Sequence, residues 1–176
     1  MKLILGVCGS ISAYKGMDIF RMFQKEGHTV DVILTRSAAR FITPLSFETF
    51  APGRVFTDMF AAGQDPLLHI NLGRGADLLL VAPATANMIG KMSHGIADDL
   101  LSTTCLAFPG RVVVAPAMNT GMYGHPAVVQ NLETLRSRGV EVVEPEEGSL
   151  ACAVEGRGRL AATEAIYRHC MRLIDV

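Results

Sequence analysis

The chain has 176 residues, of which 49% are hydrophobic and 19% charged, and its mean hydropathy is +0.31. These values predict one domain with a substantial core and exclude an intrinsically disordered chain. The net charge is −1 and the sequence carries no basic run, which argues against nucleic acid or an anionic membrane as a partner.

The sequence shows neither the pattern of a targeting segment nor the cysteine spacing of a disulfide framework. No apolar stretch reaches the roughly 18 residues of a membrane span, and the start MKLILGVCGS lacks a signal-peptide pattern, so we expect a cytoplasmic protein. The four cysteines are widely scattered, which predicts reduced thiols with neither disulfides nor a metal site: Cys8, Cys105, Cys152 and Cys170.

The first predicted unit is a strand over residues 2–7 that leads through Cys8, Gly9 and Ser10 into a helix ended by Gly27. We assign the apolar face of this helix to Ile11, Tyr14, Ile19, Phe20 and Phe23. A glycine–serine turn at a helix N-terminus favours an anion. Because the turn lacks the GxGxxG and GK[ST] spacings, it suits a mononucleotide phosphate better than NAD or ATP. A purely structural turn is the alternative.

The second predicted strand covers residues 29–34 and is followed by Thr35, Arg36 and Ser37. The hydroxyls of Thr35 and Ser37 would lie beside the first loop and could complete a phosphate cradle, although a helix N-cap explains them equally well. Beyond them we expect a short helix capped at Thr43 and a surface turn at residues 61–66.

A third strand is predicted over residues 78–81, followed by a loop from Pro83 to Met88 that opens a helix. Thr85 and Asn87 in this loop could orient the polar edge of a ligand. His69 stands upstream between two apolar residues, where a histidine is usually structural. Asp98 and Asp99 are read as residues that cap or solvate a helix.

The fourth strand, residues 112–115, runs into the segment PAMNTGMY at 116–123, which we read as an irregular loop that forms a pocket. Ligands of open α/β sheets bind at such carboxyl ends of strands. The amide of Asn119 and the thioethers of Met118 and Met122 could hold a small carboxylate against a flat apolar ring. This site would bind rather than attack.

The C-terminal part is predicted to contain a helix over residues 126–138, a strand over 140–143, a mobile glycine-rich flap around Cys152, and a final helix over 163–174 with Cys170 in the core. Arg157 and Arg159 of the flap could meet a phosphate or simply be solvated. The alternation of strands and helices predicts a single α/β domain over residues 1–176, a doubly wound, Rossmann-like parallel sheet with helices on both faces.

Three motifs carry a resemblance to a known family. PATANM at 83–88 resembles PASANT, PAMNTGMY at 116–123 resembles PxMNxxMW, and GSLACAVEGRGRL at 148–160 resembles a substrate-clamp segment ACGxxGxGRM. All three belong to the homo-oligomeric flavin-containing cysteine decarboxylases. The departures from the family motifs are Thr85, Met88, Tyr123, Ala153 and Leu160.

The resemblance implies a bound FMN and decarboxylation of 4'-phosphopantothenoylcysteine to 4'-phosphopantetheine in coenzyme A biosynthesis. It implies His69 as the base, Cys152 as the proton donor and Asn119 as the ligand of the substrate carboxylate. The implied FMN contacts are Gly9, Ser10, Ile11, Thr35, Arg36, Ser37, Phe41, Thr85, Ala86, Asn87, Met88 and Ala117. Further implied substrate contacts are Ser149, Ala151 and Leu160.

The family also implies a homotrimer, or a dodecamer of trimers, with active sites between subunits, and a phosphopantothenate–cysteine ligase that is fused or separate. Three alternatives stay open: a peptidyl-cysteine decarboxylase, a flavin prenyltransferase or other FMN protein of the same fold, and a non-enzymatic FMN-binding regulatory subunit. Cys152 in its motif argues against the first alternative and PAMNTGM against the second. The presence of His69, Asn119 and Cys152 without an acidic tail argues against the third.

Overall fold

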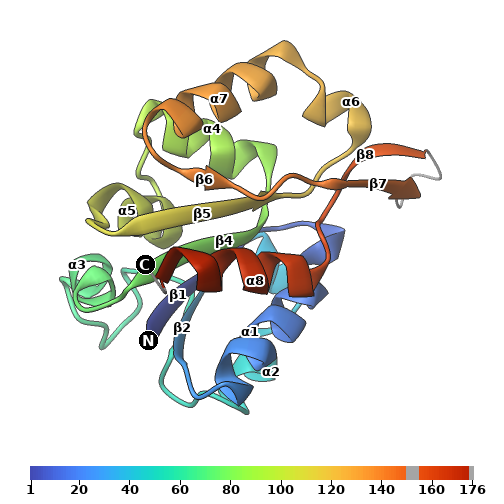
Figure 1. Ribbon diagram of the computed structural model, residues 1–176. Coiled ribbons are helices and arrows are strands. Elements are labelled where there is room, and N and C mark those ends of the chain that lie inside the picture. The colour runs from blue at the N-terminus through green and yellow to red at the C-terminus, as the bar shows by residue number, and fades with distance from the viewer. Residues whose placement is uncertain (150–154, 175–176) are drawn as a thin grey trace.

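A computed structural model describes residues 1–149 and 155–174 of the chain. Its centre is a six-stranded sheet in the order β3-β2-β1-β4-β5-β6, with every neighbouring pair parallel (Figure 1). The strands are β1 (Lys2–Val7), β2 (Thr29–Leu34), β3 (Val55–Phe56), β4 (Leu78–Ala84), β5 (Arg111–Pro116) and β6 (Glu141–Val142). This confirms the predicted doubly wound sheet, whose strand order reverses between β1 and β4.

Helices cover both faces of the sheet. One face packs against α1 (Lys15–Lys25), α2 (Pro44–Glu48) and α8 (Thr163–Ile174), and the other against α3 (Leu68–Gly73), α4 (Ala86–His94), α5 (Leu100–Ala107) and α7 (Pro126–Ser137). Alternate strand residues feed the two cores, with Leu3 and Leu5 on the first side and Ile4 on the second. Within the described residues, no helix combines the length and apolar character that a membrane span requires.

The first strand–helix unit differs from the prediction in one respect. A 3₁₀ turn, η1 (Ile11–Tyr14), precedes α1, and Ser10 caps it by accepting a hydrogen bond from the Ser12 N–H at 3.2 Å. Residues three apart share one side of a 3₁₀ turn, and here that side faces outward, so Ile11 and Tyr14 are 60% and 58% exposed. Their predicted place on the buried helix face is wrong, whereas Gly27 follows the helix with φ +78 as expected of a cap.

The third predicted strand is longer in the structure than its predicted range of residues 78–81. β4 continues to Ala84, which pairs with Pro116 of β5, and Pro83 lies inside the strand after a cis peptide bond. The predicted loop over 83–88 therefore reduces to Thr85. Its hydroxyl accepts a hydrogen bond from the Met88 N–H at 3.4 Å and caps α4.

The glycine-rich C-terminal segment is a β-hairpin where the structure describes it. β7 (Glu146–Ser149) pairs antiparallel with β8 (Glu155–Arg159). Ala151 and Cys152 lie outside the described residues. The final helix α8 has the predicted bounds, and Cys170 on it is fully buried, as predicted.

Candidate active site

The four segments that sequence analysis assigned to a cofactor meet at one edge of the sheet. They follow the carboxyl ends of β1, β2, β4 and β5, on either side of the point where the strand order reverses. Open α/β sheets bind their ligands at this crevice. The fold therefore places the predicted cofactor segments together, although they are as far apart in sequence as Gly9 and Ala117.

Backbone hydrogen bonds tie these segments to one another. The Thr35 N–H donates to the carbonyl of Val7 at 3.0 Å, and the Cys8 N–H donates to the carbonyl of Pro83 at 3.2 Å. On the other side of the edge, the Ala117 N–H donates to the carbonyl of Ala84 at 3.0 Å. The loops after all four strands consequently share one rigid frame.

The turn after β1 approaches the turn after β2 as closely as a glycine allows. A Cβ built on Gly9 would lie 2.4 Å from the Cβ of Ser37 and 2.9 Å from its carbonyl carbon. Any larger residue would push the two turns apart. The turn that carries Ser10 and the turn that carries Ser37 are thus in direct contact, and we call this pair of turns the cradle.

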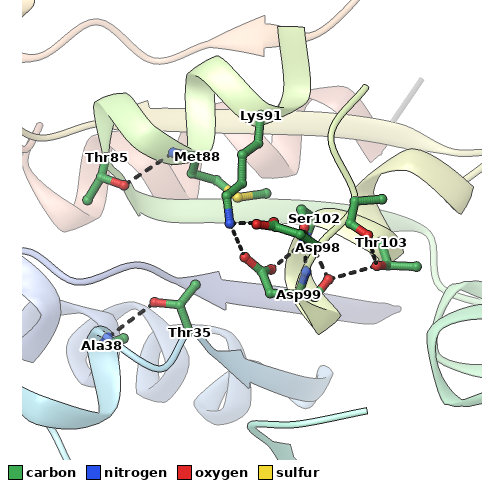
Figure 2. A network of polar contacts seen from close by, with 10 residues as sticks. Thr35, Ala38, Thr85, Met88, Lys91, Asp98, Asp99, Ser102 and Thr103 are labelled. Atoms are coloured by element: carbon green, nitrogen blue, oxygen red, sulfur yellow. Dashed lines mark hydrogen bonds and ion pairs between the residues drawn. The ribbon is translucent and has the colours of Figure 1, made fainter. Parts of the chain in front are cut away.

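The neighbouring hydroxyls have local roles as well. Thr35 Oγ1 accepts a hydrogen bond from the Ala38 N–H at 3.2 Å (Figure 2), while Ser37, the cap residue of the 3₁₀ turn η2 (Ala38–Arg40), makes no capping bond with its side chain. Among the remaining predicted cofactor residues, Arg36, Ser37, Phe41 and Asn87 are exposed, whereas Met88 and Ala117 are buried. The exposed residues can offer side chains to a ligand, whereas the N–H groups of Met88 and Ala117 already donate to Thr85 Oγ1 and the carbonyl of Ala84.

A cavity of about 530 Å³ opens beside the cradle. Thr35 and Arg36 line it together with three neighbouring parts of the chain. These are the end of β2 and the residues after it (Leu34, Ala39 and Pro44), the segment after β3 (Thr57, Asp58, Met59 and Phe60), and the start of α5 with the two residues before it (Asp98, Asp99, Leu100 and Leu101). This volume lies within the range of about 300–1,000 Å³ for cofactor pockets. Sequence reasoning missed the contribution of α5, although Asp99 and Ser102 have the spacing of a capping box.

An ion cluster fixes the start of α5 at this edge. Lys91 Nζ of α4 lies 2.6 Å from Asp98 Oδ1 and 2.6 Å from Asp99 Oδ2 (Figure 2). Asp99 and Ser102 form a reciprocal capping box. Burial acts to raise the pKa of the Asp99 carboxyl, but hydrogen bonds from Lys91 and the Ser102 backbone outweigh it and hold the pKa below its usual value. The capping role expected of Asp99 is confirmed.

The cysteine next to the cradle is inert. Cys8 is 1% exposed, and burial raises the pKa of its thiol to about 12, so it stays protonated at neutral pH. Cys8, Cys105 and Cys170 are all free thiols, as predicted.

Asn119 occupies a defined turn rather than an irregular loop. It caps the single-turn helix α6 (Thr120–Tyr123), and its Oδ1 accepts a hydrogen bond from the Gly121 N–H at 2.8 Å. This bond fixes the orientation of the amide. Met118 is half-buried against the core and Met122 is 49% exposed, so the two predicted thioethers have different surroundings.

His69 is not brought to Asn119 within one chain. It is a half-buried residue of α3, which lies on the opposite side of the molecule from α6 (Figure 1). A Cβ on Gly73, at the end of this helix, would touch Phe108, just before β5 begins. The C-terminal end of this helix therefore lies near the start of β5, at the amino-terminal edge of the sheet.

The remaining predicted substrate residues are only partly described. Ser149 ends β7, while Ala151 and Cys152 are outside the described ranges. Leu160 is fully buried in the core under α8. The roles assigned to these residues stay predictions.

Comparison with known proteins gives a consistent family. Residues 1–175 match the model of the Flavoprotein family. The coenzyme A biosynthesis bifunctional protein CoaBC of Bacillus subtilis is 46% identical over 168 residues, and that of Mycobacterium tuberculosis is 45% identical over 174 residues. These alignments cover 94% and 99% of this chain, which spans 41% of the length of both relatives.

Solved structures agree along the whole chain. A PPC decarboxylase mutant complexed with pantothenoylaminoethenethiol matches with a TM-score of 0.88 and 30% identity, covering 99% of this chain and 98% of that one. The FMN-dependent cysteine decarboxylase SpaF matches with a TM-score of 0.86 and 31% identity, covering 100% and 98%. The chain therefore belongs to the Flavoprotein family.

Proposed function

We propose that the chain is an FMN-dependent decarboxylase that converts 4'-phosphopantothenoylcysteine to 4'-phosphopantetheine and CO₂ in coenzyme A biosynthesis. The observation that carries this proposal is the end-to-end similarity to a PPC decarboxylase bound to a pantothenoyl compound. The similarity to the bifunctional coenzyme A proteins supports the same pathway. The three sequence motifs supply Asn119, Cys152 and the residues proposed to border the FMN ring.

The cradle at the sheet edge fits FMN. Gly9, Ser10 and Ser37 would hold the phosphate, because the close approach at Gly9 brings the turn with Ser10 and the turn with Ser37 together at the carboxyl ends of β1 and β2. Thr85 to Met88 and Ala117 would border the ring. When bound, FMN supplies a reversible store for the electrons of the substrate thiol, which makes loss of CO₂ accessible.

The proposed roles of the side chains follow from what each can do with a proton or a charge. His69 would accept the proton of the substrate thiol. Asn119 would hold the carboxylate through a neutral amide, which orients that group without the ion pairing that would oppose its departure as CO₂. Cys152 would return a proton to the substrate carbon left by the carboxylate.

The separation of His69 from Asn119 supports an active site between subunits. α3 and α6 lie on opposite sides of one chain, so a second copy would have to supply the histidine. We propose a homotrimer, with a dodecamer of trimers as its larger form. Mixing His69→Gln and Asn119→Ala subunits should restore activity that each variant lacks, because some interfaces regain both residues. Failure of refolded mixtures to recover activity would contradict shared sites.

The bifunctional relatives are longer than this chain, which bears on the enzyme that supplies its substrate. Since the chain spans 41% of the bifunctional proteins, we propose that a ligase of phosphopantothenate and cysteine, fused or separate, supplies its substrate. The predicted cytoplasmic location fits this pathway.

A peptidyl-cysteine decarboxylase is the second candidate, because peptidyl-cysteine decarboxylase EpiD also matches, with a TM-score of 0.82. Parallel assays with 4'-phosphopantothenoylcysteine and with a peptide ending in cysteine separate the two. We expect CO₂ from the first substrate only. Release from the peptide alone would contradict the proposal.

A further inference from the structure

One carboxylate joins three elements around α6. Glu144, which follows β6, accepts a hydrogen bond from the Tyr123 hydroxyl of α6 through Oε2 at 2.6 Å. The same oxygen lies 3.0 Å from Arg157 Nη2 of β8, and Oε1 pairs with Arg136 of α7. Glu144 thus connects the C-terminal hairpin to the helix that Asn119 caps.

The cluster keeps its charges at neutral pH. Burial acts to raise the pKa of the Glu144 carboxyl, but hydrogen bonds from Tyr123 and Arg136 outweigh it and lower the pKa. Burial, together with the hydrogen bond to Glu144, raises the pKa of Tyr123 to about 12, so its hydroxyl remains a donor. The Arg157 guanidinium also lies 5.8 Å from the centre of the Tyr123 ring.

Strand β8 lies directly against both neighbours of Asn119. The Met118 N–H donates to the carbonyl of Gly158 at 2.9 Å, and a Cβ on Gly158 would come within 2.3 Å of the Met118 oxygen. A Cβ on Gly156 would lie 2.6 Å from Thr120 Oγ1. Glycine permits this close approach, but it provides no side chain that could interlock with the segment.

The contact between β8 and Thr120 is also unfavourable in one respect. Within the described residues, the buried Thr120 Oγ1 has no hydrogen-bond partner. A buried hydroxyl without a partner loses the hydrogen bonds that water would give it, so this contact opposes docking of the strand. Other contacts must therefore hold β8 in place, and the Glu144 cluster is next to it.

We propose that Glu144 is a positioning residue that holds β8 against residues 118–120 and so fixes the hairpin beside Asn119. The catalytic consequence rests on the proposed function, because it assumes that the hairpin and Asn119 act on one substrate. The structural part stands independently of that function.

Limited trypsin digestion of the full chain tests the structural part, since Arg159 lies within β8. Exposed ion pairs contribute little each, so we expect cleavage after Arg159 to be about fivefold faster in Glu144→Gln, with a smaller increase in Tyr123→Phe. The matched control is Glu141→Gln, which removes a nearby carboxylate that faces His169, 3.6 Å away, instead of the hairpin. It should be cleaved like the unaltered chain.

Equal cleavage of Glu144→Gln and Glu141→Gln would overturn the proposal. Faster cleavage at sites throughout the chain would overturn it as well, since that result indicates general destabilisation. On the FMN-loaded protein, Glu144→Gln should raise KM for 4'-phosphopantothenoylcysteine while FMN affinity stays unchanged. If the unaltered protein has no decarboxylase activity, the proposed function fails, and the digestion still decides the role of Glu144.

Discussion

Replacing Gly9 with alanine tests how the cofactor cradle is built. The added Cβ would stand 2.4 Å from the Ser37 Cβ, where carbon atoms ordinarily keep about 3.5–4.0 Å. The turns after β1 and β2 must then separate by about 1 Å. Since the proposed phosphate site uses both turns, a separation of the turns should weaken FMN binding.

The size of the effect follows from the cost of overpacking. An extra methyl group in a filled space costs about 1–3 kcal/mol, which corresponds to an FMN affinity about 5- to 150-fold weaker. The measurement is a titration of FMN followed by the change in its fluorescence. Thermal unfolding of the free protein, measured alongside, separates weaker binding from loss of fold.

Gly90→Ala is the matched control. Gly90 is inside α4, and a Cβ there would lie 3.7 Å from Asn131 Nδ2, which is an ordinary contact. This variant should bind FMN normally and gain about 0.5–1 kcal/mol of stability, because alanine favours a helix. Equal FMN affinities in the two variants would refute the assignment of the phosphate to this cradle.

Two further predictions concern charges in the fold. Asp31 is buried in β2 and pairs with Lys2 at 3.1 Å and Arg54 at 2.8 Å, so Asp31→Ala should lower the free energy of unfolding in urea by about 1–3 kcal/mol; an unchanged midpoint would contradict this role. The pKa of the Asp99 carboxyl is lower in the folded chain than in the unfolded chain, so its ionised form stabilises the fold. This contribution is fully present above the pKa of the unfolded state and is lost as pH falls through the lower pKa of the folded state. The stability difference between the unaltered chain and Asp99→Asn should therefore be constant near neutral pH and shrink below about pH 4; a difference that persists at low pH would contradict the ion pair with Lys91.

The sheet and its terminal helix could be predicted because their signals are local. Nearly continuous apolar runs such as residues 3–7 suit strands buried on both faces, and the apolar residues of α8 recur at helical spacing. The edge of the sheet at which ligands bind could also be predicted from the sequence, because the polar loops come directly after these apolar strands.

The errors arose where the backbone geometry differs from the one that the residue types favour. Pro83 is typical of the end of a strand, but β4 continues through it to Ala84, which pairs with Pro116 of β5. Ile11 and Tyr14 have the residue types of a core, yet a 3₁₀ turn directs them outward. The spacing of apolar residues does not distinguish a 3₁₀ turn from the first turn of an α-helix.

Part of the candidate site could not be predicted for a related reason. The resemblance assigns His69 and Asn119 to one reaction, but α3 and α6 lie on opposite sides of one chain, which depends on how the helices cover the whole sheet (Figure 1). The contacts of Glu144 join residues 123, 136 and 157, and no local pattern marks it.

The oxidation state of the product tests the central claim most directly. The FMN-loaded protein is incubated with 4'-phosphopantothenoylcysteine without an added reductant, and the product is weighed by mass spectrometry. The account predicts a thiol lighter than the substrate by about 44 mass units, the loss of CO₂ with the electrons returned. Unchanged substrate, or a product that has lost two further hydrogens, would contradict it.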